Sequence, residues 1–92
     1  MVTAIVALNV RRDKVNDVAS ELSGMKGITE VYSVSGRYDL MAVVRTKDNE
    51  ALADVVTGNL LKVDGIESSE TMLAFRSYSR HDLDSMFAIG AD

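Results

Sequence analysis

The stretch LMAVV, residues 40–44, decides the fold because it repeats the stretch VTAIV, residues 2–6, at a separation of 38 residues. The same shift superposes further apolar and glycine positions: Val18 on Val56, Leu22 on Leu60, Gly27 on Gly65, and Ile28 on Ile66. A repeat fixes the architecture of a chain before any single element does. Each copy of this repeat reads as strand, helix, strand.

Four strands are expected from the apolar patterns. Residues 2–10 and 40–44 are apolar on both alternating faces, which is typical of central strands covered on both sides. Residues 28–35 and residues 66 to about 78 predict two more strands, entered through Gly27 and Gly65.

Two amphipathic helices are predicted between these strands. Residues 13–23 carry an apolar stripe at helical spacing, formed by Val15, Val18, Ala19 and Leu22. Residues 49–61 carry a second stripe, formed by Leu52, Val55, Val56 and Leu60, and Asp48 precedes it as an N-cap. Gly58 costs this second helix about 1 kcal/mol relative to alanine.

The order βαββαβ predicts a ferredoxin-like α+β fold, a four-stranded antiparallel sheet with two helices on one face. Right-handed crossovers place the first and third strands in the middle. Residues 1–78 form this domain, and residues 79–92 are expected to add a short C-terminal helix with Leu83, Met86 and Phe87 at helical spacing.

The face of the sheet without helices is also expected to be apolar. In the first strand, Ala4, Val6 and Leu8 alternate with Ile5 and Ala7, so one of these two sets points away from the helices. An exposed apolar patch on a small domain usually marks an interface. We therefore expect at least a homodimer with the two open faces packed together.

A tight turn is predicted where VSGRYDLMAVV, residues 34–44, joins the second and third strands. Gly36 followed by Arg37 fits a two-residue type II′ hairpin, whose first central residue needs a positive φ. The register then pairs Tyr32 with Met41, and it leaves Asp39 on the face of an otherwise apolar strand.

Asp39 has two interpretations. Its carboxylate either binds free backbone N–H groups beside the turn, or it receives the ammonium of a small ligand whose carboxylate is bound by turn amides. Arg37 at the tip is expected to be solvated rather than to clamp a carboxylate.

The run VYSVSGRYDLMAVV, residues 31–44, resembles the Gly-x-Tyr-Asp hairpin of the RAM domain, the ligand-binding and dimerising module of the Lrp/AsnC family of transcriptional regulators. GIESSETMLAF, residues 65–75, resembles the last strand of that module, where two hydroxyl residues stand two apart. The resemblance implies dimers that assemble further, with amino-acid effectors bound at contacts between protomers. It implies these ligand-binding residues: Gly36, Tyr38, Asp39, Ser69 and Thr71. Arg37, which lies between them at the tip of the hairpin, is added to the ligand-binding candidates by its position alone.

Geometry gives a further expectation about this site. The first strand separates the hairpin strand from the last strand, and alternation puts Asp39 and Thr71 on opposite faces of one protomer. A pocket that uses both residues is therefore expected between chains. Ser69 stands where many family members have threonine, and it still supplies a donor and an acceptor.

Charge and composition exclude several functions. Ten basic against fourteen acidic residues give a net charge of −4, and no basic stripe suggests direct nucleic-acid binding. No helix-turn-helix is recognisable before Val2, so we expect a stand-alone RAM protein that senses an effector or joins a full-length Lrp/AsnC regulator. Without cysteine or a membrane-spanning apolar segment, a cytoplasmic protein is the default.

No catalytic residue, metal site or other cofactor is expected. His81, Asp82 and Asp84 are adjacent on a short segment and do not converge as metal ligands do. Two alternatives stay open: a small dimeric α+β barrel enzyme, which shares this topology, and a purely structural oligomerisation module without a ligand.

Overall fold

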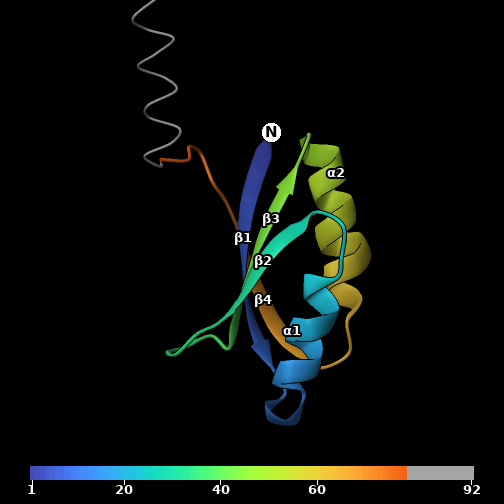
Figure 1. Ribbon diagram of the computed structural model, residues 1–92, viewed down its shortest axis with the longest axis vertical. Helices are drawn as coiled ribbons and strands as arrows, with labels where there is room; N and C mark the ends of the chain where they lie inside the picture. Colours follow the sequence, from blue (N-terminus) through green and yellow to red (C-terminus); the bar gives the residue numbers. More distant parts are fainter. Residues whose placement is uncertain (79–92) are drawn as a thin grey trace, which may run out of the picture.

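The computed structural model describes residues 1–78. The chain runs through β1 (Val2–Val10), α1 (Val15–Ser23), β2 (Ile28–Ser33), β3 (Leu40–Thr46), α2 (Asn49–Ala53) and β4 (Ile66–Leu73). The strands form one four-stranded antiparallel sheet in the order β2-β3-β1-β4, with both helices on one side (Figure 1). The expected ferredoxin-like fold, with the first and third strands in the middle, is confirmed.

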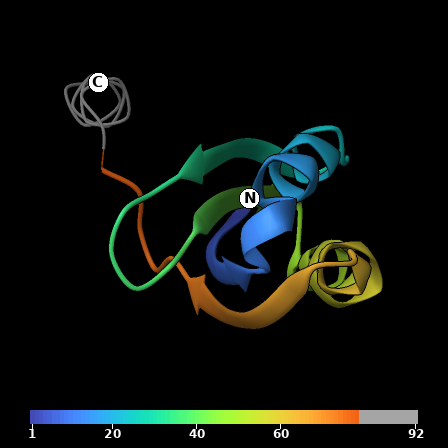
Figure 2. The same ribbon diagram turned by 90° about the horizontal axis from the view of Figure 1, so that it is seen from below.

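The hydrophobic core lies between the sheet and the helices. β1 and β3 each present every second residue to it, and α1 adds Val18 and Leu22. The core residues with no exposed surface are Val6, Leu8, Leu22, Leu40, Ala42, Val44 and Leu60. Figure 2 shows α1 and α2 next to each other on this face, while the connection between β2 and β3 extends away from them.

Both helices depart from the continuous α-helices expected. A 3-10 turn, Arg12–Lys14, precedes α1, so the α-helix begins two residues after the predicted residue 13. At α2, the predicted N-cap is confirmed, because the Asp48 carboxylate accepts a hydrogen bond from the Ala51 N–H at 2.8 Å. The predicted helix 49–61 was wrong beyond Ala53, where a π-helical segment, Asp54–Asn59, and a 3-10 turn, Leu60–Lys62, follow.

The π-helical segment contributes two valines to the core. Val55 and Val56 are adjacent in sequence, yet both are buried against the sheet. The wider turn of a π-helix changes the direction of the residues that follow it, and Leu60 is then fully buried as well. Gly58 lies in this segment, and a Cβ added there would meet no atom within 4 Å.

Two strands are shorter than predicted. β2 ends at Ser33, and β4 ends at Leu73 instead of about residue 78. Leu73 lies opposite Ala4, and the Ala74 N–H donates to the Thr3 carbonyl at 2.9 Å. Because β1 begins at Val2, the residues after Ala74 soon pass beyond the end of their neighbouring strand.

The face away from the helices carries apolar side chains, as predicted. Ile5 lies opposite Val43 on β3 and Met72 on β4. Ile5 is 36% exposed, Met72 39% and Tyr32 50%. A patch of this kind on a small domain suits an interface.

The predicted C-terminal helix, with Leu83, Met86 and Phe87, lies outside the described residues, as does His81. In residues 1–78, no helix has the length and apolar character required to cross a membrane.

Candidate functional site

Six residues, 34–39, connect β2 to β3, and the loop inside the last hydrogen bond of the hairpin contains four residues, not two. The Val34 N–H donates to the Asp39 carbonyl at 3.1 Å, which leaves residues 35–38 outside the ladder. The type II′ hairpin was therefore wrong in its loop length. Ser35 and Tyr38, the pair that would close a two-residue turn, share no backbone hydrogen bond in residues 1–78, while the Asp39 N–H donates to the Leu8 carbonyl on β1 at 2.9 Å.

Gly36 has the positive φ that the sequence predicted, at 113°. Residues with a Cβ rarely adopt this value, whereas glycine does so at little cost. An added Cβ would meet no atom within 4 Å, so conformation and not space requires glycine here. Arg37 is exposed at the tip of the hairpin.

Asp39 is attached to β1 at two points. In addition to its N–H contact with Leu8, its Oδ2 accepts a hydrogen bond from the Val10 N–H at 2.8 Å. Val10 is only 3% exposed, so this N–H needs a protein acceptor. One oxygen of the carboxylate thus binds a backbone N–H, as the structural interpretation of Asp39 expected, but the donor lies on β1 and not in the turn. In residues 1–78, its other oxygen, Oδ1, makes no hydrogen bond or ion pair, so it remains available to a ligand.

Tyr38 connects the hairpin to the opposite edge of the sheet. Its hydroxyl donates to Oε2 of Glu70 on β4 at 2.7 Å, and Glu70 lies opposite Ala7 of the intervening strand β1. The hydrogen bond to the Glu70 carboxylate raises the pKa of Tyr38 above its ordinary value. Ala7 is fully buried although it lies on the face without helices.

Ser69 and Thr71 lie on the other face of the sheet. They pair with Leu8 and Val6, whose side chains belong to the core beneath the helices. Thr71 borders a mainly apolar groove of about 360 Å³ between β4 and α2. One chain therefore does not bring these two hydroxyl residues together with Tyr38 and Glu70.

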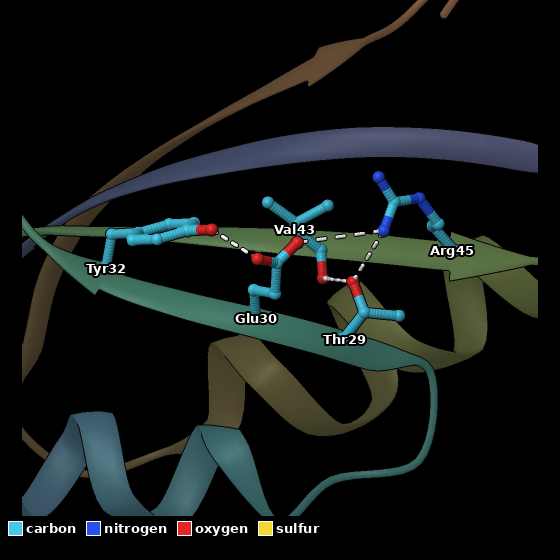
Figure 3. Close-up of polar contacts among 5 residues, drawn as sticks. All are labelled: Thr29, Glu30, Tyr32, Val43 and Arg45. Carbon is cyan, nitrogen blue, oxygen red and sulfur yellow. Dashed lines mark hydrogen bonds and ion pairs between the residues drawn. The ribbon is translucent and has the colours of Figure 1, made fainter. Parts of the chain in front are cut away.

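A second polar cluster lies on the open face of β2 and β3 (Figure 3). The Tyr32 hydroxyl donates to Glu30, and this hydrogen bond to a carboxylate raises the pKa of Tyr32. Arg45 lies 3.8 Å from Glu30 and donates to the Thr29 hydroxyl at 3.2 Å. Thr29 in turn donates to the Val43 carbonyl at 3.3 Å.

Sequence reasoning missed Glu70 and this second cluster. A signal for Glu70 was present, because a residue between Ser69 and Thr71 on a strand must face the opposite side. Within the described part of the chain, no three His, Cys, Asp or Glu side chains form a group that could hold a metal ion.

The fold and the hairpin define a small ferredoxin-like domain whose open sheet face is apolar in part and carries two polar clusters, one at the hairpin and one on β2 and β3. Residues 3–84 match the family model described as the Lrp/AsnC ligand binding domain. The chain therefore belongs to the Lrp/AsnC ligand-binding domain family.

Known proteins similar to this chain include regulators and domains of similar length. The HTH-type transcriptional regulator LrpA of Pyrococcus abyssi is 36% identical over 62 residues, which are 67% of this chain and 44% of LrpA. The chain thus spans under half of that regulator. The crystal structure of TTHA0845 from Thermus thermophilus has a TM-score of 0.81 and 46% identity, covering 87% of this chain and all of the other.

A more distant structure shares the fold alone. The transcriptional regulator NMB0573 of Neisseria meningitidis, solved as a complex with L-Met, has a TM-score of 0.76 at 16% identity. The alignment covers 86% of this chain and 53% of that regulator.

Proposed function

We propose that this chain is an effector-binding and oligomerisation module of the Lrp/AsnC family, that its effector is an amino acid, and that it is not an enzyme. Membership of the ligand-binding domain family supports the proposal, and so do relatives named as transcriptional regulators. The complex of NMB0573 with L-Met shows that one protein of this fold takes an amino acid.

The observation that carries the proposal is that the two oxygens of the Asp39 carboxylate have different surroundings. Oδ2 is fixed by the Val10 N–H, which orients the side chain, and Oδ1 remains to accept an ammonium group. The N–H groups of residues 35–38 donate to no acceptor in the described part of the chain. Acceptor and donors at one hairpin match the two charged ends of an amino acid.

The proposed site is completed by a second protomer. Gly36, Arg37, Tyr38 and Asp39 belong to the hairpin, whereas Ser69 and Thr71 face the helix side of β4. A ligand that touches both sets therefore lies between chains. The apolar open face, with Ile5 and Met72 partly exposed, forms the dimer contact, and dimers assemble further.

The chain acts on transcription through assembly. With a net charge of −4, its own surface does not attract a phosphate backbone. We therefore place its action in co-assembly with a full-length Lrp/AsnC regulator, whose oligomeric state the effector then shifts.

A thermal-shift screen of the twenty amino acids tests the effector hypothesis. A ligand at 100 times its Kd stabilises the folded state by about 2.7 kcal/mol, so one or a few amino acids should raise the melting temperature. Light scattering with and without the hit should show a change in oligomer size. If no amino acid raises the melting temperature of the assembled protein, the proposal is wrong.

A further inference from the structure

A cavity of about 530 Å³ lies at the end of the sheet opposite the hairpin. It is formed by three segments that are distant in sequence: the loop before β2, the end of β3, and the helical region after Asp48. Its lining residues are Lys26, Gly27, Arg45, Thr46, Lys47, Ala51, Asp54, Val55 and Asn59. A volume of this size is within the range of small-molecule sites.

The backbone brings the cationic residues of this cavity together. The Arg45 N–H donates to the Gly27 carbonyl at 2.8 Å, so the segments that carry Lys26 and Lys47 lie next to each other. Gly27 has φ 94°, and an added Cβ would lie 2.8 Å from Cγ2 of Val55. The loop therefore packs closely against the π-helical segment, and Val55 and Ala51 provide apolar lining.

The charge of the cavity is opposite to that of the chain. Three cationic side chains and one carboxylate line it, whereas the whole chain has a net charge of −4. Arg45 already meets Glu30 at 3.8 Å (Figure 3). Lys26 and Lys47 make no hydrogen bond or ion pair within residues 1–78, so two ammonium groups remain for an anion.

The π-helical segment forms one wall of the cavity, through Asp54, Val55 and Asn59. Such segments occur frequently at functional sites. Asn59 adds an amide that donates or accepts hydrogen bonds. Cations, an amide and an apolar lining together suit a small molecule that carries a phosphate group on an uncharged body.

We propose that this cavity is a second ligand site, independent of the hairpin, and that it binds a small phosphate monoester. Lys26 and Lys47 bind the phosphate group, and the body of the ligand rests against Ala51 and Val55. The Asp54 carboxylate repels the phosphate group and so weakens its binding. An amino acid would instead place its ammonium against Asp54, so this one residue distinguishes the two ligand classes.

The test is calorimetric titration of the full chain with AMP, with inorganic phosphate, and with adenosine as the probe that lacks the phosphate. Removing one lysine that lies about 4 Å from the phosphate in a water-like environment weakens binding about fivefold. The double variant Lys26→Gln/Lys47→Gln should therefore bind AMP about 25-fold more weakly. Asp54→Asn should bind it about fivefold more tightly.

The matched control is Lys14→Gln/Lys62→Gln, which changes the net charge equally at two lysines outside the cavity lining. It should bind AMP as the wild type does, and adenosine should bind at least tenfold more weakly than AMP. The proposal is overturned if AMP does not bind, if both double variants weaken binding equally, or if Asp54→Asn weakens it. Circular dichroism of each variant confirms that the fold is intact.

Discussion

Replacing Asp39 by alanine separates the structural role of this carboxylate from its proposed ligand role. In the wild type, Oδ2 accepts the Val10 N–H at 2.8 Å, and Val10 is 3% exposed. Water therefore has almost no access to replace the lost acceptor. Asp39→Asn is the informative partner variant, because its amide oxygen still accepts the Val10 N–H while its charge is gone.

The expected loss follows from the burial of the donor. Leaving a buried backbone N–H without an acceptor costs about 1–3 kcal/mol, and hydrogen bonds to charged groups contribute about 1.5–3 kcal/mol. We expect Asp39→Ala to lower the free energy of unfolding by about 2 kcal/mol. For a domain of this size, that corresponds to a decrease in Tm of about 8–16 °C. Asp39→Asn should lose less than about 1 kcal/mol.

Urea denaturation followed by circular dichroism at one fixed protein concentration measures these differences. The concentration must be fixed because association adds to the apparent stability. Asp64→Ala is the matched control, an exposed aspartate with no hydrogen-bond partner in residues 1–78, and it should stay within about 0.5 kcal/mol of the wild type. If Asp39→Ala is as stable as this control, the contact with Val10 does not stabilise the hairpin.

Three further predictions concern other parts of the molecule. The hydrogen bond from Tyr38 to Glu70 raises the pKa of Tyr38, so its contribution to stability is present below the pKa of an unfolded tyrosine and is lost as pH rises through the higher folded value. In an absorbance titration of the phenolates, Tyr32 and Tyr38 should both ionise late, because the pKa of each is raised. Tyr38→Phe should reduce the amplitude of this late phase, and an unchanged late phase would contradict the assignment. Gly27→Ala should lose at least about 2 kcal/mol, because Gly27 has a positive φ and a Cβ would lie 2.8 Å from Val55, whereas Gly58→Ala should be neutral or gain up to about 1 kcal/mol. Equal effects of these two substitutions in urea denaturation would refute this explanation. Ile5→Lys should dissociate the dimer in light scattering without unfolding the chain. Leu61 is similarly exposed but lies on the helix side, so Leu61→Lys should leave the dimer intact. A dimeric Ile5→Lys variant would place the interface elsewhere.

The topology could be predicted because local patterns determine it. The glycines before β2 and β4 and the apolar stripes of the helices depend on nearby residues only. The repeat at 38 residues then shows that both halves of the chain carry the same strand-helix-strand pattern. The register of Tyr32 opposite Met41 followed from a turn centred on Gly36 and Arg37, and it is observed although the loop is longer than predicted. The apolar open face followed from strands that are apolar on both sides.

Details that depend on tertiary contacts could not be predicted in the same way. The hairpin loop is longer than expected because Ser35 and Tyr38 do not pair, and the Asp39 N–H beside it donates to Leu8, on a strand distant in sequence. β4 ends early because its neighbouring strand ends. The burial of Val55, Val56 and Leu60 was predicted from the helical stripe, but the π-helical form of the backbone at residues 54–59 leaves no mark in that pattern.

The candidate site was predictable only in part. Asp39 was identified because a carboxylate interrupts an apolar strand. Only the structure shows that one of its oxygens accepts the Val10 N–H while the other has no partner in residues 1–78. Glu70, which binds Tyr38, could have been identified by alternation along β4. Ser69 and Thr71 were identified through the family resemblance and remain a prediction.

The most direct test of the account is calorimetric titration of the amino acid found by the thermal-shift screen into the wild type and into Asp39→Asn. The variant keeps an acceptor for the Val10 N–H but not the charge that receives the ligand's ammonium. We expect a folded Asp39→Asn protein, with the oligomeric state of the ligand-free wild type, that no longer binds the amino acid measurably. Binding of equal affinity to both proteins would contradict the central claim that the hairpin carboxylate recognises the effector.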